Sequence, residues 1–460
     1  MEGNDFMNKI QYLKELREKS SELTSYKRVN SLFDIGSFVE IDSFCKKQDN
    51  FTGVVCGFGT IDGIQAYCFA QDPNIDGGAM SLAQANKIKK IYELALKNGL
   101  PIIGIFDSKG AHIDEGIDSM NAFAKLINCA NSLSGVVPQI AVVLGVCTGN
   151  NAVLASMSDI TIMAKDARFC LNTPSVYRAG ENIGTAESAY NNGTAHIVAE
   201  NDESCFNYVR SLLRLLPQNN LAPVPVCDGG TPTVCPFINC EFLDAEDKIS
   251  LSNDFGKSAK TLLARINGIT CGAVVTTSSN KKLDYESCVK ISSFVRLCDS
   301  FSIPIVNIID ADGYDVSKEN ELNNGPRIAA LLSSVYCETT APVITVIVGR
   351  ACGNIYTAFA GRGTNADVVY AFPDAVISPL NPEASVIVLD SERLKNGENI
   401  DKLVDEYESN QASAFIAAEN GYLDDIITKD ELRLKLSMTL NMLRGKRSSK
   451  PAKKHSNLPF

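Results

Sequence analysis

The sequence predicts an α/β fold in which one layered unit is used twice along the chain. Short apolar runs rich in valine and isoleucine have the length of strands that are buried on both faces. They lie at residues 102–106, 140–144, 160–163, 305–309, 343–348 and 368–371. Between these runs, apolar residues recur at helical spacing over 83–96 and 286–298. Alternation of strand and helix favours a layered α/β unit in each half.

Six landmarks of the first half recur in the same order in the second half, which indicates a duplication. The offset between the members of each pair is nearly constant. It is 203 for Pro101 and Pro304 and for Asp107 and Asp310, 204 for Pro138 and Pro342 and for Gly149 and Gly353, 205 for Ile61 and Ile266, and 208 for Asp166 and Asp374. Proline and glycine are frequent around residues 215–245. We therefore expect two domains, at 1–225 and 226–460.

Composition narrows the classes of function. The net charge of −11 argues against a nucleic-acid partner, because phosphate contacts need clustered lysine and arginine. The basic stretch at 444–454 is interpreted as a solvated or partner-docked tail. No apolar run is long enough to span a membrane, and the first 20 residues lack the apolar stretch of a secretory signal. Cys147, Cys271 and Cys352 lie inside apolar runs and are expected to be buried, reduced thiols of a cytoplasmic protein.

The residues that bind metals are sparse and badly spaced for a metal site. The chain has three histidines and no pair of cysteines separated by two residues, so no metal centre is expected.

In both halves a buried strand ends in a glycine and is followed by a stretch that can begin a helix. The residues are Gly149, Asn150 and Asn151 in the first half and Gly353, Asn354 and Ile355 in the second. A helix that starts there leaves backbone N–H groups unpaired, and such donors can hold an oxyanion or an enolate oxygen. Taken alone, either turn is more simply explained as a structural connection. Its recurrence in both halves favours a catalytic role.

Other candidate residues are few. His112 lies in a loop at 110–116 that either faces a site or packs against the protein. Asp107 and Asp310 end buried strands and are interpreted as caps of the turns that follow, rather than as bases. Gly77 and Gly78 predict a tight turn, and the alternative is a backbone that a ligand approaches closely. This scarcity of titratable groups favours catalysis by backbone donors.

Several motifs give the chain a specific resemblance from about residue 10 to its end. They are SLFDIGSFVE at 31–40, FAQDPNIDGG at 69–78, DSKGAHIDEG at 107–116, SGVVPQ at 134–139, GTAH at 193–196, FVRLCDSFSIP at 294–304 and KHSNLPF at 454–460. In their order, the sequence resembles the carboxyltransferase (β) subunits of biotin-dependent acyl-CoA carboxylases. This family includes propionyl-CoA carboxylase β, methylmalonyl-CoA carboxyltransferase and the α subunits of acyl-CoA decarboxylases.

The resemblance implies two tandem crotonase-like domains and a transfer of carboxyl groups between carboxybiotin and the α-carbon of a short acyl-CoA. The first half would hold the acyl-CoA, with its thioester oxygen at Asn150 and Asn151. The second would hold the biotin, with its ureido oxygen at Asn354 and Ile355. The residues implied to bind substrate are Gly77, Gly78, Lys109, Gly110, Ala111, His112 and Thr357.

The resemblance also implies partners. The sequence has no Met-Lys-Met motif for biotin attachment and no phosphate-binding loop of the G-x-x-x-x-G-K-[ST] type. Biotin would therefore arrive on a partner carrier, a separate biotin carboxylase subunit would charge it, and the CoA thioester would be the substrate. The family builds its site across a dimer within a larger homo- or hetero-oligomer.

Two alternatives to a working carboxyltransferase remain open at this point. The family usually has Gly-Gly-Ala at both turns, whereas this chain has asparagine at 150, 151 and 354, and it has Lys109 in a loop that is usually glycine-rich. A catalytically weakened paralogue that binds acyl-CoA or acts as a structural subunit would explain these changes. A crotonase-type hydratase or isomerase is disfavoured, since no pair of glutamates lies near either turn.

Overall fold

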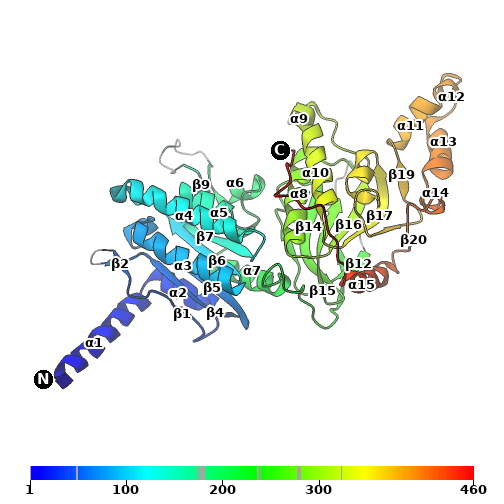
Figure 1. Ribbon diagram of the computed structural model, residues 1–460. Coiled ribbons are helices and arrows are strands. Elements are labelled where there is room, and N and C mark those ends of the chain that lie inside the picture. The colour runs from blue at the N-terminus through cyan, green and yellow to red at the C-terminus, as the bar shows by residue number, and fades with distance from the viewer. Residues whose placement is uncertain are drawn as a thin grey trace. The chain divides into compact units, whose positions relative to one another are not determined.

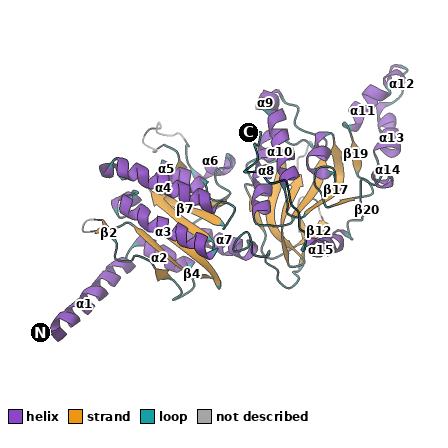
Figure 2. Ribbon diagram, in the orientation of Figure 1, coloured by secondary structure: helices purple, strands orange, loops and turns teal. Residues whose placement is uncertain are grey.

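The computed structural model describes residues 2–47, 50–172, 176, 182–235, 238, 240–276, 281–322 and 324–459. The chain divides into two compact units, residues 1–222 and 223–460 (Figure 1). Each unit contains a sheet with helices packed against it (Figure 2). No described helix is long and apolar enough to cross a membrane, and the described residues contain no cluster of side chains suited to a metal ion.

Unit 1 is built on a sheet whose strands run in the order β1-β4-β5-β6-β7-β8-β10, with β9 paired to β7. β1, β4 and β5 pair antiparallel, and the pairs from β5 onward are parallel. The strands are β1 Val39–Glu40, β4 Val54–Ile61, β5 Ile64–Gln71, β6 Ile102–Ser108, β7 Gln139–Thr148, β8 Ile160–Ala164, β9 Arg168–Cys170 and β10 Ile197–Ala199. A separate small hairpin joins β2 Lys46–Lys47 to β3 Asn50–Phe51.

The helices of unit 1 lie between and around these strands. They are α1 Glu2–Ser21, α2 Thr24–Leu32, α3 Leu82–Asn98, α4 Ile117–Leu133, α5 Asn150–Ser156, α6 Ala186–Asn191 and α7 Asp202–Leu215, with 3₁₀ turns η1 Asp76–Gly78 and η2 Ile113–Glu115. α3 shows how local sequence sets the bounds of a helix. The hydroxyl of Ser81 accepts a hydrogen bond from the N–H of Gln84 at the start, and Gly99 ends the helix in a left-handed conformation.

Unit 2 repeats this sheet with the order β13-β14-β15-β16-β17-β18-β20, and β19 pairs with β17. Its strands are β13 Ile249–Leu251, β14 Ala259–Ile266, β15 Ile269–Thr276, β16 Ile305–Ala311, β17 Val343–Cys352, β18 Val368–Ala371, β19 Val376–Ser378 and β20 Asp425–Ile426, and a hairpin pairs β11 Pro232–Cys235 with β12 Cys240–Asp244. Its helices are α8 Tyr285–Ser300, α9 Lys318–Leu322, α10 Gly325–Glu338, α11 Pro382–Leu389, α12 Ser391–Lys395, α13 Ile400–Tyr407, α14 Ala414–Glu419 and α15 Leu432–Leu443, with π-helical turns η4 Tyr356–Ala360 and η5 Glu408–Ala412.

The two units share details of register as well as strand order. The pairing of β6 with β7 shifts between Phe106 and Ser108, and that of β16 with β17 shifts between Ile309 and Ala311. Isolated bridges join Met80 to Ala111 and Leu283 to Tyr314, again 203 residues apart. The predicted duplication of one α/β unit is therefore confirmed at the level of hydrogen bonding.

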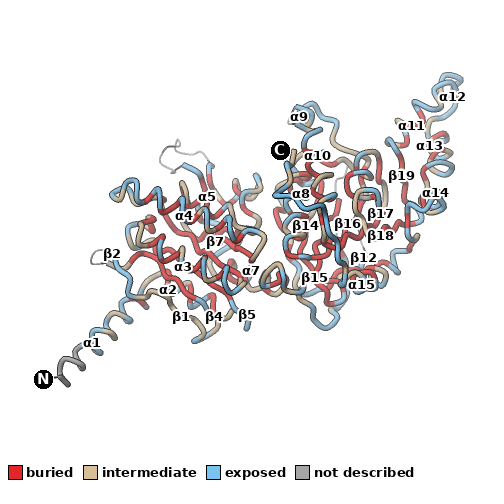
Figure 3. Tube along the Cα trace, viewed as in Figure 1, coloured by how far each residue is buried: buried red, intermediate tan, exposed pale blue. Residues whose placement is uncertain are grey.

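Burial explains why the apolar runs predicted these strands correctly. Every residue of β6 and of β15 is buried, as expected of central strands covered on both faces. Figure 3 shows buried residues along the strands of both units and exposed residues on the helix surfaces. Cys147, Cys271 and Cys352 are buried free thiols, as predicted.

The basic C-terminal tail does not stand free of the protein. After α15, the ammonium of Lys446 lies 2.7 Å from the carboxylate of Asp367 and donates to the carbonyl of Ala341. Further along, Lys453 pairs with Glu338 at the end of α10. The tail is thus docked on unit 2 itself.

Candidate functional site

The first predicted turn passes from a strand through a left-handed glycine into a helix. β7 ends at Thr148, Gly149 takes a φ of 62°, and α5 starts at Asn150. A side chain at Gly149 would meet no atom within 4 Å, so it is the left-handed backbone rather than space that favours glycine. The carbonyl of Gly149 accepts from Ala152 and Val153. The N–H groups of Asn150 and Asn151 open the helix, where no intrahelical acceptor exists, and none of the described residues supplies one.

The side chain of Asn151 is directed into the protein and is fully buried. Its amide NH₂ donates to the hydroxyl of Ser108 at 2.7 Å, and its oxygen accepts from the amide of Gln71 at 3.1 Å. Gln71 also accepts from the N–H of Asp107 at 3.3 Å. These bonds tie the turn to β5 and β6, and they use the asparagine as an anchor. Sequence analysis missed Gln71 and Ser108, whose positions at the ends of apolar strands gave no signal of this partnership.

The predicted substrate-binding loops of unit 1 pack directly on one another. A side chain at Gly78 would lie 2.1 Å from the carbonyl oxygen of Asp107, and Gly78 has a φ of 71°. The N–H of Lys109 donates to the carbonyl of Gly77 at 3.1 Å. Gly77 and Gly78 therefore form the predicted tight turn, and the backbone that approaches Gly78 closely belongs to the chain itself.

His112 lies beside a lysine that the sequence analysis did not single out. Lys47, carried by the β2–β3 hairpin, contacts the Nε2 atom of His112, and its ammonium lies 3.4 Å from Asp76 and 3.7 Å from Glu115. The Nε2 atom of His112 is also 3.2 Å from Asp76. Its Nδ1 atom is buried and has no hydrogen-bond partner among the described residues. His112 and Lys109 lie on the same loop as Ala111, next to the first turn.

Asp107 and Asp310 play a role that differs from the predicted one. Neither caps the turn that follows its strand. Asp107 accepts a hydrogen bond from the N–H of Val146 on the neighbouring strand at 3.1 Å, and Asp310 accepts from that of Arg350 at 2.8 Å. Both bonds bridge the register shift described above, where the strands no longer pair with each other. Each carboxylate occupies the space beside a glycine, since a side chain at Gly145 or Gly349 would overlap it.

The carboxylates of Asp107 and Asp310 also form ion pairs with different cationic side chains. Arg28 of α2 pairs with Asp107 at 2.8 Å and extends to Asp202 at the start of α7, whereas Lys281 lies 3.2 Å from Asp310. Asp107 and Asp310 therefore serve to hold adjacent strands.

The second predicted turn repeats the first with different surroundings. Gly353 has a φ of 56°, and its N–H donates to the carbonyl of Ser378 at 2.8 Å, as that of Gly149 does to Leu171 at 3.0 Å. Asn354 is exposed, Ile355 is fully buried, and the chain continues into the π-helical turn η4. Thr357 is exposed on this turn, where its hydroxyl donates to the carbonyl of Asn354.

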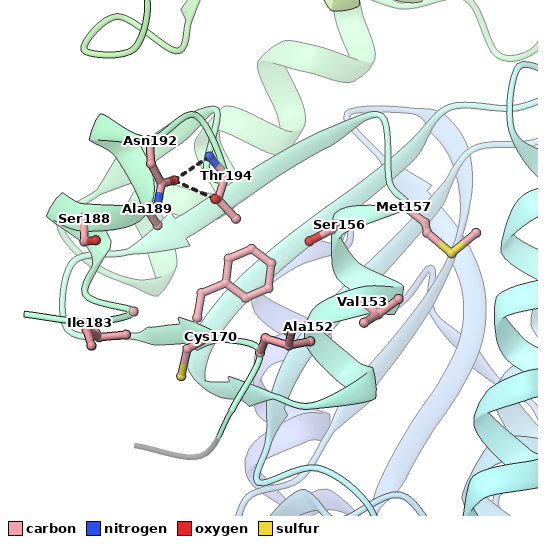
Figure 4. A pocket seen from close by; sticks show the side chains of 13 residues that line it. Ala152, Val153, Ser156, Met157, Cys170, Ile183, Ser188, Ala189, Asn192 and Thr194 are labelled. Carbon is pink, nitrogen blue, oxygen red and sulfur yellow. Dashed lines mark hydrogen bonds between the residues drawn. The ribbon is translucent and has the colours of Figure 1, made fainter. Parts of the chain in front are cut away.

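A cavity of about 550 Å³ borders α5 in unit 1 (Figure 4). Its walls come from Ala152 and Val153 on α5, Phe169 and Cys170 on β9, and Ile183. The residues drawn in Figure 4 are mostly apolar, and its polar members are hydroxyl and amide groups such as those of Thr194 and Asn192, which bond to each other. The described lining contains no carboxylate, histidine or lysine.

A smaller cavity of about 290 Å³ lies in unit 2 and includes Asn354 of the second turn. Tyr314, Cys288 and Tyr285 contribute to its wall. The hydroxyl of Tyr314 is buried and has no hydrogen-bond partner among the described residues. Burial raises the pKa of this phenol well above its usual range, so it stays protonated at neutral pH.

With both turns located, comparison with known proteins decides the family. Residues 17–237 and 240–458 match the model of the carboxyl transferase domain. The chain belongs to the carboxyl transferase family. Among its relatives, the methylmalonyl-CoA decarboxylase subunit alpha of Veillonella parvula is 34% identical over 97% of this chain and 95% of its own length. The 12S subunit of methylmalonyl-CoA carboxyltransferase from Propionibacterium freudenreichii subsp. shermanii is 31% identical over 97% of this chain and 93% of its own.

A crystal structure of transcarboxylase 12S, with methylmalonyl-CoA and methylmalonic acid bound, matches the whole carboxyl transferase chain. The TM-score is 0.91 at 31% identity, and the match covers 100% of this chain and 99% of that one. The predicted tandem crotonase-like fold and the predicted carboxyltransferase component of a biotin-dependent acyl-CoA carboxylase or decarboxylase are thereby confirmed. The alternative of a structural, catalytically weakened paralogue is not favoured.

Proposed function

We propose that this chain moves a carboxyl group between a biotin held by a partner carrier and the α-carbon of a short acyl-CoA, in the cytoplasm. Unit 1 holds the thioester and unit 2 holds the biotin ring. The observation that carries the proposal is the pair of turns at Gly149 and Gly353, which have the same left-handed glycine and the same anchoring hydrogen bond from its N–H.

In unit 1, the N–H groups of Asn150 and Asn151 bind the thioester oxygen. When a proton or CO₂ leaves the α-carbon, negative charge builds on that oxygen, and fixed N–H donors stabilise it without having to reorganise. The buried bonds of Asn151 to Gln71 and Ser108 keep these donors in place. Gly77, Gly78, Lys109, Gly110, Ala111 and His112 form the adjoining loops of the thioester site.

The apolar cavity beside α5 receives the acyl group. Ala152 and Val153 follow directly after the two donor residues on the helix, so the cavity begins where the thioester would end. Apolar walls exclude water from a reactive enolate. A hydratase or isomerase needs carboxylates at this place, and the described lining offers none, which supports carboxyl transfer over the crotonase-type alternative.

In unit 2, the N–H groups of Asn354 and Ile355 bind the ureido oxygen of biotin, and Thr357 is the residue there that the family relationship assigns to substrate binding. Bound biotin supplies the nitrogen that carries the carboxyl group. The family relationship supports partners of three kinds: a biotin carrier, a biotin carboxylase subunit, and further copies of a carboxyltransferase chain. The related transcarboxylase 12S assembles as a hexamer.

The purified protein tests this proposal when it is incubated with malonyl-CoA and with methylmalonyl-CoA, each with and without free biotin. We expect the CoA thioester to lose its carboxyl group only when biotin is present. Release of CO₂ and chromatography of the CoA thioesters measure this loss. The compound that reacts names the substrate. Binding of the thioester by calorimetry without any loss of carboxyl would contradict the proposed activity.

A further inference from the structure

One lysine of the β2–β3 hairpin joins separate segments of unit 1. The ammonium of Lys47 contacts the Nε2 atom of His112 and lies 3.4 Å from Asp76 and 3.7 Å from Glu115. Asp76 begins the turn η1, whereas Glu115 ends the turn η2. The side chain of Lys47 is only 19% exposed, so it is packed among these partners rather than extended into water.

The partners of Lys47 are themselves bonded to the start of α3. The Oε2 atom of Glu115 accepts a hydrogen bond from the N–H of Leu82, the first residue of that helix, at 2.6 Å. The N–H of His112 donates to the carbonyl of Met80 at 2.9 Å. Lys47 therefore holds η1 and the loop at 110–116 against the same end of α3.

The beginning of this loop lies against the first turn. The hydroxyl of Ser108 accepts from the N–H of Gly110 at 3.2 Å and from the side-chain amide of Asn151 at 2.7 Å. A side chain at Gly110 would lie 3.6 Å from the carbonyl oxygen of Thr148, which ends β7 just before the turn. The loop that Lys47 holds is thus in contact with the helix start that carries the proposed thioester donors.

The second half of the chain does not repeat this cluster. The positions 203 residues after His112 and Glu115 are Asp315 and Lys318, so an acid replaces the histidine and a lysine replaces the acid. Among the described residues, the carboxylate of Asp315 accepts hydrogen bonds from Ser317 in its own loop. The cluster is therefore no by-product of the duplicated fold, and its task is specific to unit 1.

We propose that Lys47 is a positioning residue for the CoA thioester, whose ammonium keeps η1 and the loop at 110–116 in the arrangement that binds it. This inference rests on the proposed function, since it takes unit 1 as the thioester site. The ammonium is already occupied by Asp76, His112 and Glu115, so Lys47 acts through these residues. The donors of the first turn have their own anchor in Asn151. Loss of Lys47 should therefore weaken binding of the thioester and spare the chemical step.

The test compares full-length Lys47→Met with Lys46→Met, which removes an exposed lysine of the same hairpin. Calorimetry with malonyl-CoA and with methylmalonyl-CoA gives the Kd, and the biotin-dependent loss of carboxyl gives kcat and the KM values. For Lys47→Met we expect the Kd and the KM for the thioester to rise about tenfold. We expect kcat to stay within about twofold and the KM for biotin to stay unchanged. Lys47→Arg keeps a cation that can bond to carboxylates and should restore most of the affinity, and Lys46→Met should match the unchanged protein.

Glu115→Gln separates positioning from direct binding of a substrate anion by Lys47. Glutamine keeps an oxygen for the N–H of Leu82 and loses the charge that holds the ammonium. If Lys47 positions the loops, this variant also raises the KM for the thioester, and the two changes combined have less than the product of their separate effects. A lower KM in Glu115→Gln, which would free Lys47 for an anionic group of the substrate, would overturn the inference.

Other results also decide the matter. An unchanged KM for the thioester in Lys47→Met would overturn the inference, and so would an equal rise in Lys46→Met, because general attraction between charges would then explain both. If the Tm of Lys47→Met falls and the KM values for thioester and biotin rise together, the role is structural and the inference fails. It fails too if the unchanged protein binds neither thioester. If the unchanged protein binds a thioester with the help of Lys47 but removes no carboxyl group, the proposed function fails and the role of Lys47 in binding stands.

Discussion

At the scale of single residues, the side chain of Asn151 has a structural role at the first turn. Asn151 stands where the usual family pattern has an alanine, and a larger side chain next to a ligand would be expected to crowd it. Its side chain instead turns into the core and joins Gln71 to Ser108. Because polar groups in the interior must be satisfied, this asparagine and its two partners form one unit.

We predict that Asn151→Ala lowers turnover about ten- to a hundredfold and stability by about 1–3 kcal/mol. The change leaves the buried amide of Gln71 and the hydroxyl of Ser108 without their partner and lets the turn shift. Urea unfolding and the biotin-dependent assay measure the two effects. Asn128→Ala, at an exposed position of α4, is the matched control and should leave both unchanged. Equal stability and turnover of the two variants would contradict the role given to Asn151.

At the scale of elements, the repeated helices α3 and α8 each bury one lysine at the same place in the repeat. The ammonium of Lys87 pairs with Glu40 at 3.0 Å and donates to the carbonyl of Val54. Lys290, which is 203 residues later, donates among the described residues only to the carbonyls of Ser252 and Phe255. Burial lowers the pKa of Lys290 from 10.5 to about 7. Lys290 thus anchors the loop that contains Ser252 and Phe255, and its buried positive charge is poorly compensated.

This difference predicts a stability that depends on pH. Between pH 7 and 10.5 the folded protein holds Lys290 neutral, while the unfolded chain keeps the lysine protonated. The unfolded state therefore binds more protons, and the free energy of unfolding rises with pH by up to about 1.4 kcal/mol per unit from this group. Below pH 7 the lysine is charged in both states, and the cost of burying the charge is fully present.

Urea unfolding at several pH values checks the contribution of this residue. In Lys290→Met the rise between pH 7 and 10 should be smaller than in the unchanged protein. Lys402→Met, at an exposed position of α13, should retain it. The same slope in all three proteins would show that Lys290 does not titrate in this range.

The elements also show what a single sequence can predict. Apolar runs predicted β6, β7, β16 and β17 because central strands are buried on both faces, and the constant offset predicted the duplication. The two turns followed from glycine at the end of such a strand. The partners Gln71, Lys47 and Arg28 were missed, since register and loop packing bring them to the site across long stretches of chain. The capping role assigned to Asp107 and Asp310 was wrong for the same reason: each bonds a neighbouring strand.

At the scale of the whole molecule, large apolar side chains are exposed close to the loops of the proposed thioester site. Ile113 follows His112 directly, and Ile117 begins α4 and is 79% exposed. In unit 2, Ile387, Val388 and Leu389 form an exposed apolar end of α11. Apolar groups gathered near a site are typical of surfaces that a partner covers. We expect that a second copy of the chain covers the one at Ile113 and Ile117.

This expectation predicts that Ile117→Glu breaks the assembly and the activity together. The side chain is exposed, so a charge there should leave the free energy of unfolding within about 0.5 kcal/mol of its original value. In an interface, the same charge would be desolvated without a partner, and association should weaken by about tenfold or more. Light scattering with size exclusion gives the oligomer, and the assay gives turnover per chain as the protein is diluted. Leu96→Glu places the same charge at an exposed apolar residue of α3 and should change neither. An Ile117→Glu protein that keeps its oligomer but loses turnover would place Ile117 within reach of the substrate, because only a direct contact then connects the charge with the reaction.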